Sequence, residues 1–229
     1  MYNESVSTVG SAGRRGAGQR AGLSRAAVLA AARRIADAEG VDRLTMRRLA
    51  GDLGVMPNTL YSYFATKEAL LDGVLDDLLG DVDPGDPAED DWQNGLVRVM
   101  DSSRRLLLAH PRLASVFLTR PTLGPNAARL GEVTFALLRR GGLEGDRAVA
   151  AFRVLLIYSL GFAAFQAPRQ QTDSPDRTLE VQATFAGLDE GDFPELRRLA
   201  GKLAAPTTDG QFRAGLRWLL DGIASSPAS

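Results

Sequence analysis

Residues 45–64 read TMRRLAGDLGVMPNTLYSYF, a stretch that carries two short helical patterns separated by a glycine. Thr45 is a candidate N-cap for the first pattern, whose apolar face is formed by Met46, Leu49, Ala50 and Leu53. Gly54 stands in the C-cap position of that helix, and Pro57 suits the first turn of the next, where its missing N–H costs nothing. The stretch predicts two short helices joined by a tight turn, the second running through Phe64.

Helical patterns continue on both sides of this stretch. Ser24 is a candidate N-cap for a helix that ends at Gly40 and has its apolar positions at helical spacing: Val28, Ala32, Ile35 and Ala36. Thr66 is a candidate cap for a further helix from Lys67 to about Gly80. The three helices before residue 65 predict a helix-turn-helix domain, whose third helix lies in the major groove of DNA.

The third helix separates packing residues from polar ones. Leu60 and Phe64, spaced i,i+4, are expected to face inward. The opposite face offers side chains that can approach base edges and thymine methyl groups: Asn58, Thr59, Ser62 and Tyr63. Contacts with the DNA backbone are expected from residues on the flanks: Arg25, Thr45, Arg47, Arg48, Tyr61 and Lys67. A solvated surface role is the alternative for each arginine.

The string Leu53-Gly54-Val55, Thr59-Leu60-Tyr61-Ser62-Tyr63-Phe64, Lys67 and Leu70-Leu71 resembles the DNA-binding domain of the TetR family of repressors. The resemblance covers residues 23–75 almost continuously and implies a dimeric regulator that binds a palindromic operator. One departure is Met56, where family members often have a capping residue such as Ser. A cap hydrogen bond, typically worth about 1 kcal/mol, is therefore expected to be missing, so that Pro57 must preset the start of the helix.

The rest of the chain predicts an arm, a linker and a second helical domain. Residues 1–22 are rich in Gly, Ser, Ala and Arg and predict a flexible basic arm, and residues 81–90, DVDPGDPAED, predict a linker. Helical patterns then recur at 92–110, 112–119, 125–140, 146–166, 195–204 and 210–224. No stretch alternates with period two between turn signals, so the predicted fold is all-α. The predicted domains are residues 23–80 for DNA binding and residues 92–226 for ligand binding and dimerisation.

The second domain also carries a resemblance. The segments LLLAHP at 106–111, VFLTRPT at 116–122, YSLGF at 158–162 and the tail at 212–223 resemble the regulatory domain of the tetracycline-repressor branch of the family. In that branch the last two long helices form a four-helix bundle with their partners, which implies a homodimer. Five apolar residues on these helices are expected to pack either against the partner chain or in the core of a single chain: Leu155, Leu160, Leu216, Leu219 and Leu220.

The expected ligand differs from that of the tetracycline-repressor branch, which chelates a magnesium-bound drug through histidines and a glutamate. The corresponding places hold Phe117, Ile157 and apolar residues around Phe165, so neither a metal site nor a cofactor is expected. The candidate pocket residues suit a small, largely apolar effector: Trp92, Met100, Ser103, His110, Phe117, Phe135, Phe152, Tyr158, Phe162 and Phe165, with Asn126 and Gln166 as further polar anchors. The alternative for the aromatic residues is ordinary core packing, and for His110 a local role at a helix end.

Composition narrows the function further. The 229 residues include no cysteine and one histidine, which excludes thiol catalysis and sites that need several histidines. Residues 1–70 hold ten Lys and Arg against six Asp and Glu, so a basic N-terminal third precedes an acidic remainder. No secretory signal and no apolar run of about 18 residues is present, which predicts a cytoplasmic protein with no membrane span.

The sequence therefore predicts a ligand-responsive repressor and not an enzyme, since no phosphate-binding loop, metal cluster or nucleophile–base pair is present. A ligand-independent DNA-binding protein is one alternative, and a helical enzyme or carrier is another. An activator is a third, because the sign of regulation depends on where the operator lies.

Overall fold

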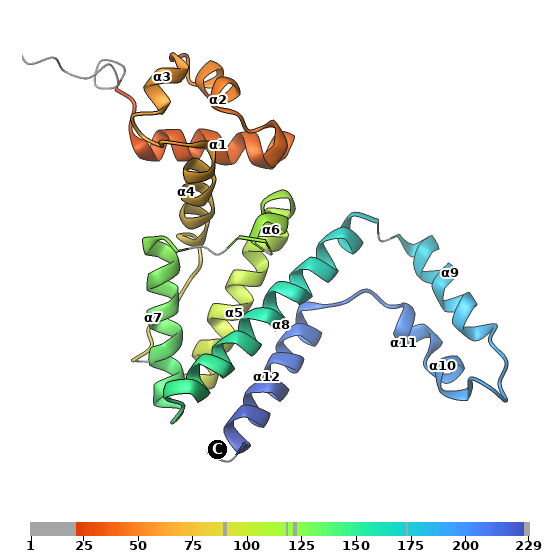
Figure 1. The fold of residues 1–229 in the computed structure, drawn as a ribbon. Coiled ribbons are helices and arrows are strands. Elements are labelled where there is room, and N and C mark those ends of the chain that lie inside the picture. The colour runs from red at the N-terminus through yellow and green to blue at the C-terminus, as the bar shows by residue number, and fades with distance from the viewer. Residues whose placement is uncertain (1–21, 89–90, 118, 121–122, 173, 227–229) are drawn as a thin grey trace, which may run out of the picture. The chain divides into compact units, whose positions relative to one another are not determined.

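The structure is a computed structural model that describes residues 22–88, 91–117, 119–120, 123–172 and 174–226. The predicted basic arm lies outside the described residues apart from Gly22. Within the described part the secondary structure is helical and contains no strand, which confirms the all-α fold (Figure 1). The chain divides into two compact units, Met1–Leu71 and Asp72–Ser229.

The first unit contains α1 (Arg25–Glu39), a single 3₁₀ turn η2 (Val41–Arg43), α2 (Met46–Asp52) and α3 (Pro57–Leu60). The predicted caps of α1 and α2 are confirmed, because Ser24 accepts from the Ala27 N–H and Thr45 accepts from the Arg48 N–H. The apolar faces of these helices and the turns between them meet in one core, whose large members are Val28, Leu29, Ile35, Leu44, Leu49, Leu60 and Phe64.

Helix α4 (Lys67–Leu79) belongs to both units, because the division falls between Leu71 and Asp72. Thr66 caps its start by accepting from the Ala69 N–H, as predicted. The sequence-based boundary at residue 80 instead assigned the whole of this helix to the DNA-binding domain. The two divisions differ over residues 72–91, which include the second half of α4 and the predicted linker. Helix α4 buries apolar residues on both sides of residue 71: Leu70, Val74, Leu75 and Leu78.

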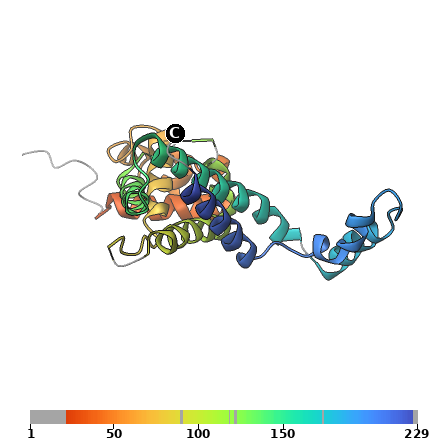
Figure 2. The same ribbon diagram turned by 90° about the horizontal axis from the view of Figure 1, so that it is seen from below.

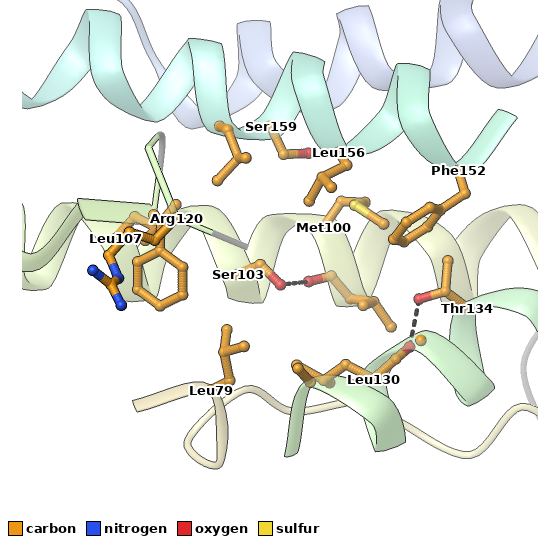
Figure 3. A pocket seen from close by; sticks show the side chains of 15 residues that line it. Leu79, Met100, Ser103, Leu107, Arg120, Leu130, Thr134, Phe152, Leu156 and Ser159 are labelled. Carbon is orange, nitrogen blue, oxygen red and sulfur yellow. Dashed lines mark hydrogen bonds between the residues drawn. The ribbon is translucent and has the colours of Figure 1, made fainter. Parts of the chain in front are cut away.

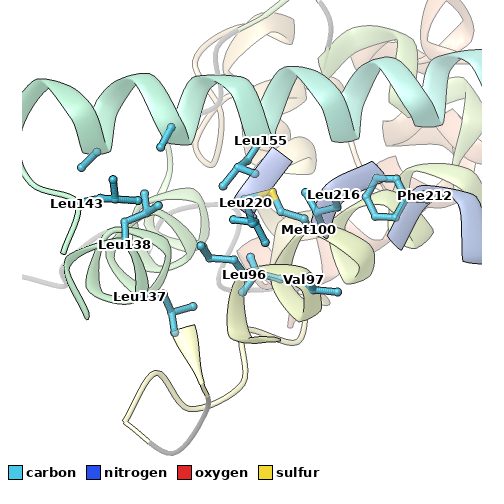
Figure 4. Packing of buried hydrophobic residues seen from close by; sticks show 13 residues of the cluster. Leu96, Val97, Met100, Leu137, Leu138, Leu143, Leu155, Phe212, Leu216 and Leu220 are labelled. Carbon is cyan, nitrogen blue, oxygen red and sulfur yellow. The ribbon is translucent and has the colours of Figure 1, made fainter. Parts of the chain in front are cut away.

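The second unit is a helical bundle built from α5 (Trp92–Ala109), α6 (Pro111–Phe117), α7 (Pro125–Arg140), α8 (Gly145–Thr172) and α12 (Asp209–Ser225). Apolar residues of α5, α7, α8 and α12 meet in one cluster that includes Leu96, Leu137, Leu155, Phe212 and Leu216 (Figure 4). Three shorter helices, α9 (Pro175–Ala186), α10 (Pro194–Arg198) and α11 (Ala200–Ala204), contact one another and lie apart from α5, α7 and α12 in both ribbon views (Figures 1 and 2).

A buried ion-pair network ties α5, α8 and α12 together. Arg104 is fully buried, and its guanidinium donates to Asp101 at 2.9 Å, to Asp209 at 2.7 Å and to Gln166 at 2.7 Å. Its guanidinium also lies 4.6 Å from the centre of the Phe212 ring. Burial alone would raise the pKa of the Asp101 carboxyl, but hydrogen bonds from Arg104 and Arg213 hold that pKa below its ordinary value. The network therefore pairs the buried Arg104 with the ionised Asp101.

The structure corrects several predicted helix boundaries. The helix predicted at 146–166 continues through Pro168 to Thr172, and the helix predicted at 195–204 is two helices divided at Leu199. The third helix ends at Leu60 rather than Phe64. Tyr61–Tyr63 form turns in which the Ser62 and Tyr63 N–H groups donate to carbonyls three residues earlier in the chain. Helix α9 was not predicted. None of its residues is buried.

Helix α8 is long and apolar enough over Gly145–Gln170 to cross a membrane, by length and composition alone. The same segment contacts α5, α7 and α12 and buries Ala151, Leu155 and Ala163. A helix packed in a bundle meets the same criteria, and 28% of the most apolar window of α8 is buried within this single chain.

Candidate functional sites

The turn between α2 and α3 has the geometry of a helix-turn-helix. Gly54 adopts φ +64°, a left-handed conformation that favours glycine, and the Val55 N–H donates back to the Ala50 carbonyl at 3.0 Å. Leu60 is fully buried, as the i,i+4 spacing with Phe64 predicted. Met56, at the N-cap of α3, makes no side-chain cap bond and is 74% exposed. The helix therefore starts on Pro57, with its apolar side fixed in the core.

The polar face of α3 and the following turn presents Asn58, Thr59, Tyr61 and Ser62 at the surface, with Thr59 half-buried and the other three exposed. The Ser62 hydroxyl donates to the Thr59 carbonyl at 2.7 Å, which holds the turn in place. Tyr63 is different, because its hydroxyl donates to the Leu23 carbonyl at 2.6 Å and the side chain is half-buried. The structure thus gathers three of the four expected base-reading residues on one face and engages the hydroxyl of Tyr63 at the start of α1.

The expected backbone-contacting residues also have distinct surroundings. Arg25 donates to the Tyr63 carbonyl at 3.1 Å and lies over the Phe64 ring at 4.1 Å. Arg48 pairs with Glu39 at 2.6 Å, and this hydrogen bond raises the pKa of its guanidinium. Arg47 is exposed on α2 and Lys67 is half-buried as the first residue of α4. Thr45 is exposed, with its hydroxyl capping α2. Arg25 and Arg48 therefore already hold the helices of this unit together.

Replacing Tyr63 by phenylalanine is expected to lower the free energy of unfolding of the DNA-binding unit by about 1 kcal/mol, because the Leu23 carbonyl loses its donor. Urea unfolding measures this effect, with Tyr61→Phe as the matched control, since Tyr61 is 50% exposed. A loss of DNA affinity in Tyr63→Phe with unchanged stability would instead assign the Tyr63 hydroxyl to base reading.

A cavity of about 250 Å³ lies within the second unit. It is bounded by the last turn of α4 and by α5, α6, α7 and α8, and its lining is predominantly apolar: Leu79, Val99, Met100, Ser103, Leu107, Phe117, Arg120, Ala127, Leu130, Gly131, Thr134, Phe152, Leu156, Ser159 and Leu160. Figure 3 shows Arg120 at one end of the cavity and Phe152 and Thr134 at the other. A second hollow of about 250 Å³ on the α6 side shares Leu107 and Leu160 with it.

The hydroxyl groups that line the cavity are engaged within their own helices. Ser103 donates to the Val99 carbonyl at 2.8 Å, Thr134 to the Leu130 carbonyl at 2.7 Å and Ser159 to the Leu155 carbonyl at 2.8 Å. Each retains lone pairs that could accept a hydrogen bond from a ligand. The charged group of the lining is Arg120, whose guanidinium pairs with Asp72 of α4.

Of the pocket residues expected from the sequence, Met100, Ser103, Phe117 and Phe152 line the cavity. The remaining expected pocket residues lie elsewhere in the unit, outside that lining: Trp92, His110, Phe135, Tyr158, Phe162 and Phe165. Sequence reasoning did not identify Arg120, Thr134 or Ser159 as lining residues, although Arg120 belongs to the quoted segment VFLTRPT.

Most of these outlying residues are packed against other aromatic rings or helix ends. Tyr158 and Phe162 contact the Phe212 ring at centroid distances of 5.3 and 5.2 Å. Trp92 packs against the backbone at Gly141, where an added Cβ would come within 2.6 Å of the indole. His110 closes α5 with its backbone N–H bonded to the Leu106 carbonyl. Core packing and helix capping therefore account for their positions.

Of the candidate polar anchors, Ser103 lines the cavity, whereas Asn126 and Gln166 do not. Asn126 donates through its amide to the Asp76 carbonyl at 3.0 Å, and Gln166 accepts from Arg104. Among the described residues there is no group of three His, Cys, Asp or Glu that could hold a metal ion.

Helices α8 and α12 carry large apolar side chains that this chain leaves exposed. Val154, Ile157 and Phe165 of α8 are 43%, 69% and 48% exposed, and Trp218 of α12 is 75% exposed. The two helices contact each other through Tyr158, whose hydroxyl donates to the Phe212 carbonyl at 3.0 Å. Exposed apolar residues on neighbouring helices form a surface that can pack against another copy of the chain.

Comparison with known families matches both parts of the chain. Residues 28–74 match the family of bacterial regulatory proteins described as the tetR family. Residues 83–226 match the tetracyclin repressor-like C-terminal domain, which covers more than half of the chain.

Individual relatives agree with these matches. An HTH-type transcriptional regulator of Saccharopolyspora erythraea is 31% identical over 206 residues, covering 89% of this chain and 86% of its own. The HTH-type transcriptional repressor DrrR1 of Streptomyces coeruleorubidus is 33% identical over 204 residues, covering 86% and 75%. The crystal structure of the Streptomyces coelicolor protein ActR in complex with actinorhodin superposes with a TM-score of 0.79 at 31% identity, covering 89% of this chain and 99% of that one.

Proposed function

This chain belongs to the TetR family of transcriptional regulators, and from that premise we propose that it is a repressor that binds a palindromic operator as a homodimer and is released by a small, largely apolar effector. Members of the family are DNA-binding transcription factors and not enzymes. We place its action in the cytoplasm, where its DNA partner is found.

The observation that carries the proposal is the position of α4. This helix belongs to both units, and its last turn contributes Leu79 to the lining of the cavity. A ligand in the cavity therefore contacts the helix that leads to the helix-turn-helix. The similar protein ActR has been crystallised with a small molecule, actinorhodin, which supports a ligand-binding role for the corresponding domain here.

For the DNA site we propose that Asn58, Thr59 and Ser62 read base edges, because they share the exposed face at α3. Arg47, Tyr61 and Lys67 are proposed to bind phosphates. For the dimer we propose that the exposed apolar side chains of α8 and α12 pack against the same helices of a second copy, since a two-fold interface uses the same surface on both chains.

Filling the cavity tests the effector half of the proposal. Gly131 of α7 lines the cavity, and an added Cβ there meets nothing within 4 Å. Gly131→Leu is expected to leave DNA binding within about twofold of wild type and to weaken cavity binding of the uncharged fluorescent probe N-phenyl-1-naphthylamine at least about tenfold, the loss that about 1.4 kcal/mol represents.

Ala128→Leu is the matched control, because Ala128 is exposed on the same helix and outside the cavity lining. Equal probe binding in wild type, Gly131→Leu and Ala128→Leu would contradict the cavity as the effector site. It would favour the ligand-independent DNA-binding protein, which is the second candidate.

A further inference from the structure

The cavity combines an apolar lining with one strongly basic group. The lining residue with a formal charge is Arg120. The hydroxyl groups of the lining donate to carbonyls of their own helices. An apolar pocket with a single guanidinium at one end suits a ligand with an apolar body and one acidic group, because a guanidinium forms charge-assisted hydrogen bonds with planar anions.

Arg120 is held by a carboxylate that an acidic ligand could replace. Its Nε and Nη2 donate to the same oxygen of Asp72, at 3.1 and 2.8 Å. The side chains of Arg120 and Asp72 are 34% and 51% exposed, so water and ions reach the pair. Pairs this exposed contribute little net stability, and a second anion can exchange with the carboxylate at low cost.

We propose that the effector is an amphipathic organic anion, whose apolar body fills the cavity and whose acidic group binds Arg120 in competition with Asp72. The inference rests on the proposed effector-responsive function and names the chemical class of its ligand. Two anions on one guanidinium repel each other, so ligand binding weakens the pair between Arg120 and Asp72.

This exchange reaches α4 because Asp72 and Asp76 both join that helix to other parts of the second unit. One turn later Asp76 is buried and accepts from the Ala127 N–H at 3.0 Å at the start of α7. Gly124 lies against the Asp76 carboxylate so closely that an added Cβ would come within 2.1 Å of it. The acidic ligand thus breaks the exposed contact at Asp72 and leaves the buried contacts at Asp76, so the exchange changes α4 at the residue nearer the DNA-binding unit.

A matched pair of fluorescent probes tests the proposal. 8-Anilinonaphthalene-1-sulfonate carries a sulfonate on the same ring system as N-phenyl-1-naphthylamine, which is uncharged. For each probe, the cavity-bound signal is the fluorescence with the full-length protein that is lost when Gly131 is replaced by leucine. Arg120→Gln is expected to weaken cavity binding of the sulfonate about tenfold and to leave the uncharged probe within about twofold. Asp72→Asn is expected to tighten sulfonate binding about threefold, because it removes the competing carboxylate.

Arg129→Gln is the matched control, since Arg129 is exposed on α7 and outside the cavity lining. Equal effects of Arg120→Gln on the two probes would overturn the acidic ligand, and a sulfonate affinity unchanged by Asp72→Asn would overturn the exchange with Asp72. DNA binding measured on the same proteins distinguishes failure of the proposed function from failure of the acidic-ligand inference. A wild-type protein that does not bind DNA would contradict the proposed function. A wild-type protein that binds DNA, together with equal effects of Arg120→Gln on the two probes, would contradict this inference alone.

Discussion

Replacing Arg104 by alanine is expected to lower the free energy of unfolding by about 3–5 kcal/mol, because it removes the buried cation that pairs with the buried Asp101 carboxylate. Arg104 has no exposed surface, and it joins Asp101 of α5 to Gln166 of α8 and Asp209 of α12. Its guanidinium also lies against Phe212. The substitution therefore removes packing and charge together, at the point where three helices of the bundle meet.

Urea unfolding at one fixed protein concentration measures this effect, since the stability of a dimer depends on concentration. Arg105→Ala is the matched control, because Arg105 pairs with the same carboxylate of Asp101 at 3.5 Å but is 58% exposed. That variant is expected to lose less than about 1 kcal/mol. Similar losses in the two variants would show that burial of the Arg104 network contributes nothing of its own.

Placing glutamate at both Ile157 and Trp218 is expected to separate the dimer and to lower operator affinity at least about 100-fold. These residues are 69% and 75% exposed in the single chain and lie on α8 and α12. A two-fold interface contains each substitution twice, so four like charges would enter one apolar surface. Without the dimer each DNA-binding unit contacts its half-site alone and loses the gain of linked binding, which is about 10²–10⁴-fold.

Sedimentation equilibrium measures the dimer, and fluorescence anisotropy measures the operator affinity. Leu123→Glu is the matched control, because Leu123 is apolar and 89% exposed but lies on neither α8 nor α12. A variant with glutamate at Ile157 and Trp218 that remains dimeric would exclude these two helices as the interface.

The fold of the first unit could be predicted closely because its signals are local. Ser24 and Thr45 act as caps, Gly54 adopts the left-handed conformation, and Leu60 is buried. The length of α3 was wrong because sequence periodicity does not distinguish an α-turn from the tighter turns at Tyr61–Tyr63.

The second unit was harder to predict where tertiary packing overrides local preference. The helix predicted at 146–166 stops short of Pro168, yet α8 continues past this proline to Thr172. Helix α9 begins with Ser174 as an N-cap and Pro175 at its first position, a start signal that was available in the sequence. Its apolar residues, such as Leu179 at 62% exposure, lie against no core that the sequence could indicate.

The sequence predicted the apolar character of the cavity but not most of the residues that line it. An apolar pocket in the C-terminal domain follows from the composition, but the periodicity of α5 and α8 is the same for residues that line a cavity and residues that fill a core. Phe152 lines the cavity, whereas Phe162 on the same helix packs against Phe212. The pairing of Arg120 with Asp72 joins residues 48 positions apart, a contact that only the folded chain reveals.

Sequence-specific DNA binding by a dimer can be measured as equilibrium binding to a palindrome selected from a random DNA pool. Fluorescence anisotropy would compare that palindrome with a duplex of the same composition in scrambled order, over a range of salt concentrations. We expect two chains bound per palindrome, an affinity at least about 10³-fold higher than for the scrambled duplex, and a steep loss of affinity with salt. Equal affinity for the two duplexes at every salt concentration would contradict sequence-specific binding.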